Sequence, residues 1–172
     1  MVKKNAKKLL DLENDFYKKP RINSRTKGNT FERAVAKRLN IRFNTEEFCR
    51  TPGSGAFGTT HKLPQYLKVH GDLITPENFK FIIEAKRGYA LQLEDLWKPN
   101  SNFYKFIEQA KRDGKAGGRD WLLIYKRDRQ KEIVVSEIEF PMQPIIQVKG
   151  KYNVYLFEEL LKLHSSNFFH NT

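Results

Sequence analysis

The chain has 172 residues, 13% of them aromatic, and a formal net charge of +12. This length suits one domain with a buried core, and the aromatic content excludes an intrinsically disordered chain. No apolar run is long enough to cross a bilayer, and the first residues do not resemble a signal peptide. The single cysteine excludes an internal disulfide and a cysteine-rich zinc site, so we expect a reducing, cytoplasmic environment.

Positive charge is concentrated at the start of the chain. Residues 1–40 hold 12 Lys and Arg but only 4 Asp and Glu. Such an excess favours a polyanionic partner, and nucleic acid fits better than a membrane because no basic amphipathic segment is rich in Trp or Leu. A solvated basic surface is the alternative.

The first 22 residues predict a basic, helical N-terminal extension. Leu9, Leu12 and Phe16 recur at helical spacing among lysines, and a proline ends the pattern. We expect this helix to dock on the domain or on a partner subunit, with a basic arm on DNA as the alternative. Residues 23–172 then form a single domain without internal repeats.

The first main helix is predicted over Asn23–Asn40, where an i, i+4, i+8 apolar stripe begins at Phe31. Glu32 is the only acidic residue of this basic helix. Two interpretations are open for it: a local ion pair with Arg33 or Lys37, or a place beside the carboxylates discussed below, where it would share their metal.

A glycine-rich loop follows a short strand predicted over Glu46–Arg50. The loop, Thr51–Gly58, contains three glycines and a proline, which excludes regular structure. Its backbone N–H groups and the Ser54 hydroxyl could bind phosphate, although a flexible turn is equally compatible. No Gly-Lys-Ser/Thr sequence follows, so the loop is not a nucleotide-binding P-loop.

Two apolar stretches, Val69–Thr75 and Phe79–Lys86, predict strands that a turn at Pro76-Glu77-Asn78 joins into a hairpin. Pairing of these strands would bring Asp72 close to Glu84. Side chains alternate along a strand, so the second strand has two faces. One face carries Phe81, Ile83 and Ala85, and the other carries Ile82, Glu84 and Lys86.

Asp72, Glu84 and Lys86 would then form a site of two carboxylates and one ammonium. Two carboxylates on apolar strands repel each other and lose hydration, and a divalent cation such as Mg²⁺ relieves both costs. Lys86 could position or deprotonate a water, or stabilise charge on a phosphorane, which suits phosphodiester hydrolysis. The alternative is a hairpin with exposed charges, in which Glu84 and Lys86 form an ordinary surface pair.

The remaining elements complete an α/β pattern. They are a helix over Ser101–Asp113 stopped by Gly114, strands over Trp121–Tyr125, Glu132–Glu137 and Ile145–Val148, and a closing helix over Val154–His164. The wholly apolar Trp121–Tyr125 predicts a strand buried on both faces. The order helix, three strands, helix, strand predicts a mixed central sheet flanked by helices, with an added N-terminal helix and C-terminal strand and helix.

Four short motifs stand in order over about residues 24–126. They are Lys27-Gly28 with Phe31-Glu32-Arg33, Arg50 with Pro52-Gly53-Ser54-Gly55, Gly71-Asp72, and Glu84-Ala85-Lys86. Together they resemble the archaeal-type Holliday-junction resolvases, which belong to the PD-(D/E)XK, restriction-endonuclease-like nucleases. The chain departs from that pattern at Gly71, where the family has proline, and in a longer segment between Gly55 and Gly71.

This resemblance implies a homodimeric, Mg²⁺-dependent endonuclease of branched DNA, with Mn²⁺ as a substitute. It assigns the metal to Glu32, Asp72, Glu84 and the Ala85 carbonyl, catalysis to these carboxylates with Lys86 and Ser54, and DNA contacts to Arg25, Lys27, Arg50, Gly53, Ser54, Gly55 and Arg87. The alternatives are a related nuclease that cuts flaps, ends or duplexes, and a non-catalytic DNA-binding protein. The small, lysine-rich chain suggests a phage or a mobile element as its source.

Overall fold

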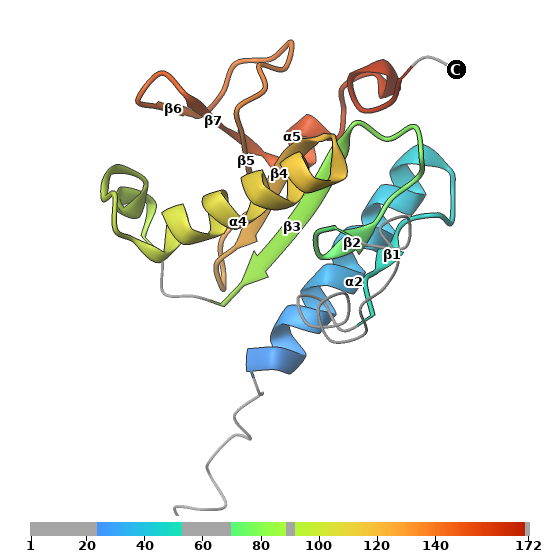
Figure 1. The fold of residues 1–172 in the computed structure, drawn as a ribbon, viewed down its shortest axis with the longest axis horizontal. Helices are drawn as coiled ribbons and strands as arrows, with labels where there is room; N and C mark the ends of the chain where they lie inside the picture. Colours follow the sequence, from blue (N-terminus) through green and yellow to red (C-terminus); the bar gives the residue numbers. More distant parts are fainter. Residues whose placement is uncertain (1–23, 53–69, 89–91, 171–172) are drawn as a thin grey trace, which may run out of the picture.

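The computed structural model describes residues 24–52, 70–88 and 92–170. Its centre is a five-stranded sheet in the order β3-β4-β5-β7-β6 (Figure 1). The strands are β3 (Phe81–Arg87), β4 (Asp120–Lys126), β5 (Ile133–Ser136), β6 (Ile146–Val148) and β7 (Tyr152–Leu156). β3 and β4 are parallel because a helix connects them, and the other neighbouring strands are antiparallel. The predicted mixed sheet between helices is therefore confirmed.

Different helices cover the two faces of this sheet (Figure 1). α2 (Ser24–Phe43) packs its apolar stripe on one face, and α4 (Asn102–Gly117) packs on the other. Alternation along β4 explains how one strand serves both layers, since Leu122 and Ile124 join the α2 cluster while Leu123 and Tyr125 join the α4 cluster. The prediction that this strand is buried on both faces is confirmed.

A two-stranded sheet lies beside α2, formed by β1 (Cys49–Arg50) and β2 (Leu73–Ile74) in antiparallel pairing. The 3₁₀ helix η2 (Leu93–Trp97) precedes α4, while α5 (Phe157–Leu160) and the 3₁₀ helix η3 (Ser165–Asn167) close the fold. Phe168, 1% exposed, docks against Phe79 and Phe81.

The prediction that Gly114 stops the second helix is wrong. α4 continues to Gly117, and Gly118, with φ of +65°, provides the left-handed C-cap. Gly114 is instead a packing residue, because a Cβ there would lie 3.0 Å from the Arg119 carbonyl oxygen and 3.2 Å from Trp121 Cβ. The helix needs glycine at this point to let the beginning of β4 approach closely.

The predicted closing helix over Val154–His164 is also wrong, except at Phe157–Leu160, which forms α5. Tyr152–Leu156 forms β7, which pairs with β5 on one side and β6 on the other. Val154 points into the α4 cluster and Tyr155 into the α2 cluster, so both faces of β7 are buried. A strand buried on both faces lacks the alternation of apolar and polar residues that identifies strands in a sequence.

The predicted N-terminal extension and most of the glycine-rich loop lie outside the described residues. None of the helices in the described part of the chain is long and apolar enough to cross a membrane.

Candidate active site

The backbone of Asp72 is held from both sides. The Thr51 N–H donates to the Asp72 carbonyl oxygen at 3.0 Å, and the Asp72 N–H donates to the Ile83 carbonyl oxygen at 2.8 Å. The predicted hairpin of two paired strands is therefore wrong, because β2 forms its ladder with β1 and, of the described residues 70–75, Asp72 alone bonds to β3. The turn at Pro76-Glu77-Asn78 is confirmed by a bond from the Phe79 N–H to the Pro76 carbonyl oxygen.

The backbone at Gly71 explains why this chain lacks the proline that the nucleases it resembles have at this position. Its φ is +78°, and proline is locked near −65°. A Cβ at this position would lie only 2.6 Å from the Ile83 carbonyl oxygen and 2.7 Å from Ile82 Cγ2. Only glycine allows the chain to turn here and still present Asp72 to β3.

We expect Gly71→Ala to lower DNA cleavage strongly and to reduce the free energy of unfolding by roughly 1–3 kcal/mol, because it adds backbone strain and a clash beside Asp72. Gly118→Ala is the matched control: φ there is +65°, but nothing lies within 4 Å of the added carbon. Urea denaturation and cleavage assays on both variants test this. Full activity of Gly71→Ala would show that Asp72 needs no such close approach.

The side chains of Asp72, Glu84 and Lys86 meet at the edge of β3. Lys86 Nζ donates to Asp72 Oδ2 at 2.8 Å and to Glu84 Oε2 at 2.5 Å. The Ala85 N–H also donates to Asp72 Oδ2, at 2.9 Å. Because N–H and C=O of one strand residue point to the same side, the Ala85 carbonyl faces the same edge. The structure thus brings together four of the predicted site residues.

Gln109 adds a contact from the other side of the site. Its Nε2 donates to Glu84 Oε2 at 2.9 Å, from α4. The predicted site does not include Gln109. Two signals point to it: it is a polar residue at the edge of the helix's apolar stripe, and it falls near a helix position that some wider relatives of the nucleases it resembles use. Glu84 Oε1, in contrast, is buried without a hydrogen-bond partner among the described residues.

Burial and charge control the protonation of this cluster. Burial, reinforced by the charge of Asp72, raises the pKa of Glu84 to about 9. Burial alone would favour a neutral Lys86 amine, but the neighbouring carboxylates raise the pKa of Lys86 above its usual value. One ammonium therefore faces two acids, and a proton on Glu84 balances the charge. The exposed surface pair considered above does not describe this site, because Glu84 is only 1% exposed.

Glu32 does not pair with Arg33 or Lys37. Its Oε2 accepts from Arg50 Nε at 2.5 Å, and Arg50 also donates to Asn29 Oδ1 at 3.0 Å. Burial, followed by the charge of Asp72, raises the pKa of Glu32. The charge of Asp72 therefore acts on the Glu32 carboxyl group, while the Arg50 guanidinium balances the charge of Glu32.

Residues 23–163 match the protein family described as phage putative PDDEXK endonuclease. The chain belongs to this family. The match includes α2, β3 with its Glu84-Ala85-Lys86 motif, and α4, so it contains the whole cluster described above. No curated protein and no solved structure matches the chain. The PD-(D/E)XK superfamily predicted from the motifs is confirmed, but the matching family is a phage family and not that of the archaeal-type resolvases.

The donor set of this site fits a divalent cation. Glu84 offers a buried oxygen that has no partner in the described part of the chain, Asp72 a second carboxylate, and Ala85 a carbonyl at the same edge. Within residues 24–52, 70–88 and 92–170, no three His, Cys, Asp or Glu side chains gather closely enough to hold a metal ion. Arg50 binds the Glu32 carboxylate instead, and Lys86 binds those of Asp72 and Glu84. The metal role of Glu32 therefore stays a prediction.

The structure describes only some of the residues that are predicted to contact DNA. Gly53, Ser54 and Gly55 lie outside the described residues, and Arg25 is in α2 with its side chain not described. Lys27 and Arg87 both bond to Asp128, at 3.3 Å each, which places two cations at the carboxyl end of β3. The sequence analysis did not identify Asp128, because its two partners lie far away along the chain.

The metal-free protein is expected to lose stability as the pH rises. Glu84 binds its proton more tightly in the folded chain, where its pKa is about 9, than in the unfolded chain, where its pKa has the usual value of 4.5. The free energy of unfolding should therefore decrease as the pH rises from about 4.5 to about 9, by up to about 1.4 kcal/mol per pH unit. Glu84→Gln should flatten this slope.

Urea denaturation in EDTA at pH 6 and pH 8 measures the effect of Glu84→Gln. Glu159→Gln is the control, because it removes a carboxylate from a partly exposed ion pair with Lys162. A wild-type slope in the Glu84→Gln variant would show that another group causes the pH dependence.

Proposed function

We propose that this protein is a Mg²⁺-dependent DNA endonuclease that resolves four-way junctions by paired nicks, with Mn²⁺ able to replace Mg²⁺. The observation that carries the nuclease assignment is the contact of Lys86 with both Asp72 and Glu84, next to a buried Glu84 oxygen that has no hydrogen-bond partner among the described residues. Membership in a PDDEXK endonuclease family supports it. The junction assignment is supported by the four motifs and by the net charge of +12.

The protein's own residues would divide the work as follows. Asp72, Glu84 and the Ala85 carbonyl would hold the cation, which supplies Lewis acidity and an acidified water. Lys86 is a cation in this arrangement, which favours stabilisation of the phosphorane over proton abstraction. Gln109 orients the Glu84 carboxylate, and Arg50 offers a guanidinium next to the site.

A homodimer would account for paired nicks. A C₂ dimer places two identical sites on strands of like polarity, and this symmetry matches that of a four-way junction. Contacts to the backbone through Lys and Arg would make binding salt-sensitive and largely independent of sequence.

One cleavage panel tests the proposal. A synthetic four-way junction, a flap, a nicked duplex and a linear duplex of the same sequence are incubated with Mg²⁺, Mn²⁺ or EDTA. We expect symmetric nicks in the junction with either metal and none in EDTA. Cutting of flaps, ends or duplexes alone would refute junction resolution, and no cutting of any substrate would refute the nuclease assignment.

A further inference from the structure

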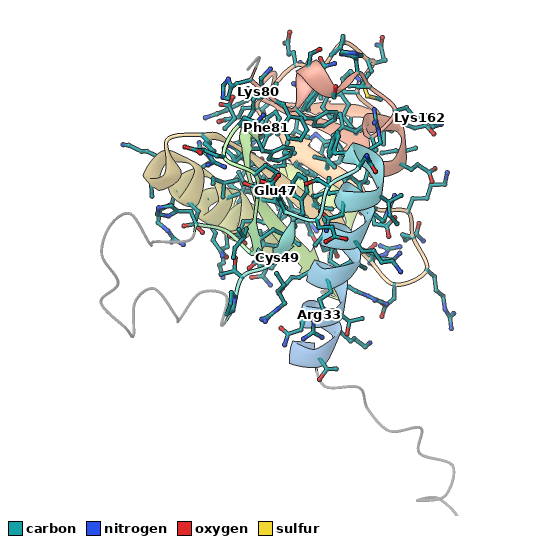
Figure 2. All side chains as sticks on the ribbon, turned by 90° about the vertical axis from the view of Figure 1, so that its right-hand side faces the viewer. Arg33, Glu47, Cys49, Lys80, Phe81 and Lys162 are labelled. Atoms are coloured by element: carbon teal, nitrogen blue, oxygen red, sulfur yellow. The ribbon has the colours of Figure 1, made fainter. Side chains whose placement is uncertain are left out.

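A groove of about 660 Å³ runs along α2 and β1 on the face shown in Figure 2. Arg33 and Cys49, both labelled there, line it from the helix and the strand. Arg33, Lys37 and Ile41 follow each other at intervals of four residues on the exposed side of α2. This row does not belong to the core, which α2 contacts through Phe31 and its other apolar residues.

Arg50 links the groove to the candidate active site. Arg50 lines the groove and binds Glu32 at 2.5 Å, and the next residue, Thr51, donates its N–H to the Asp72 carbonyl oxygen at 3.0 Å. A strand whose phosphate lies at Asp72 and Glu84 could therefore pass Arg50 directly into the groove.

Charge in the groove is unbalanced. Arg33 and Lys37 face a single acidic lining residue, Glu46, which is exposed, while the third basic lining residue, Arg50, is paired with Glu32. Arg33 and Lys37 have no ion pair or hydrogen bond within the part of the chain that the structure describes, unlike most basic residues near them. They are separated by about 6 Å along the helix axis, or roughly two nucleotide steps of duplex rise. Such a row of uncompensated cations suits the regular negative charge of a nucleic-acid backbone.

We propose that this groove holds the backbone of the cleaved DNA strand next to the scissile phosphate, with Arg33 and Lys37 each contacting a phosphate. The inference rests on the proposed nuclease function and adds to it the path of the substrate. Contacts of this type position the DNA without reading its sequence.

Salt-dependent binding gives the first test. Arg33→Gln with Lys37→Gln should lower the slope of log affinity against log salt by about 2, since each lost phosphate contact removes about one counterion. Lys149→Gln with Lys151→Gln removes the same charge from the β6–β7 turn, at the far edge of the sheet, and should change the slope less. Single-turnover cleavage by the Lys149→Gln, Lys151→Gln control should stay near the wild-type rate, because neither lysine lies at the groove or at the candidate active site.

Cys49 provides the second test, because it is the only cysteine of the chain, is exposed and lines the groove. Its alkylation by iodoacetamide is followed in EDTA, at DNA concentrations where anisotropy shows saturated binding. We expect DNA to slow alkylation in the wild type and in the control variant.

The outcomes distinguish the possible occupants. Unchanged alkylation at saturating DNA, or equal salt slopes for the two double variants, would overturn the proposal. Alkylation that slows with protein concentration instead of DNA would assign the groove to a second copy of the chain, and would also overturn it. If the wild type cuts DNA but the salt slopes and alkylation rates contradict the proposal, only the role of the groove in DNA binding is refuted. If the wild type cuts no DNA, the proposed nuclease function itself fails.

Discussion

Asp72→Asn and Glu84→Gln are each expected to abolish DNA cleavage while DNA binding survives. Both side chains lie at the edge of β3, where Lys86 bridges them and where one buried oxygen of Glu84 has no partner in the part of the chain that the structure describes. Each substitution removes a charged oxygen donor from the proposed metal site. A catalytic metal supplies several kcal/mol of transition-state stabilisation, and each 1.36 kcal/mol is a factor of ten, so the rate should fall by about 10³-fold or more.

Single-turnover cleavage and anisotropy binding with a four-way junction measure this pair of effects. Asp120→Asn is the matched control, because it removes the same charge at the opposite end of the β3–β4 pair, where Asp120 lies next to Phe81. Wild-type cutting by either site variant would show that the assignment of these carboxylates is wrong. A variant that loses both DNA binding and DNA cleavage would instead indicate a damaged fold.

Lys86→Ala is expected to lower the cleavage rate by about 10²–10³-fold while metal binding is retained. The ammonium is held by both carboxylates, so it lies where charge develops during hydrolysis, and the loss of one such group typically costs this much. The cation site itself should persist, because removing Lys86 leaves two carboxylates with less positive charge between them.

Calorimetric titration with Mn²⁺ measures metal binding by Lys86→Ala, and cleavage kinetics measure its rate. Lys151→Ala, a lysine paired with Glu137 at the β6–β7 turn, serves as the control. An unchanged cleavage rate would remove the proposed role of Lys86, and lost Mn²⁺ binding would make Lys86 a structural part of the metal site.

The order of elements and the faces of β3 follow from local sequence. Phe81, Ile83 and Ala85 lie in the α2 cluster, while Glu84 and Lys86 share the opposite face with Ile82. This could be predicted because the alternation of side chains depends only on extended backbone geometry. The errors fell where tertiary packing overrides such local rules, as at Gly114 inside α4 and at β7, which is buried on both faces.

The sequence by itself determined that acidic and basic residues would meet on a buried strand of an α/β nuclease fold, because periodicity and motif order are local properties. Only the tertiary structure decided the partners of those residues. Arg50 reaches Glu32 across 18 positions and Gln109 reaches Glu84 across 25, and Gly71 lets Asp72 bond to β3 without a hairpin ladder. Such contacts depend on how separate elements pack against one another, and no periodicity within a single element encodes them.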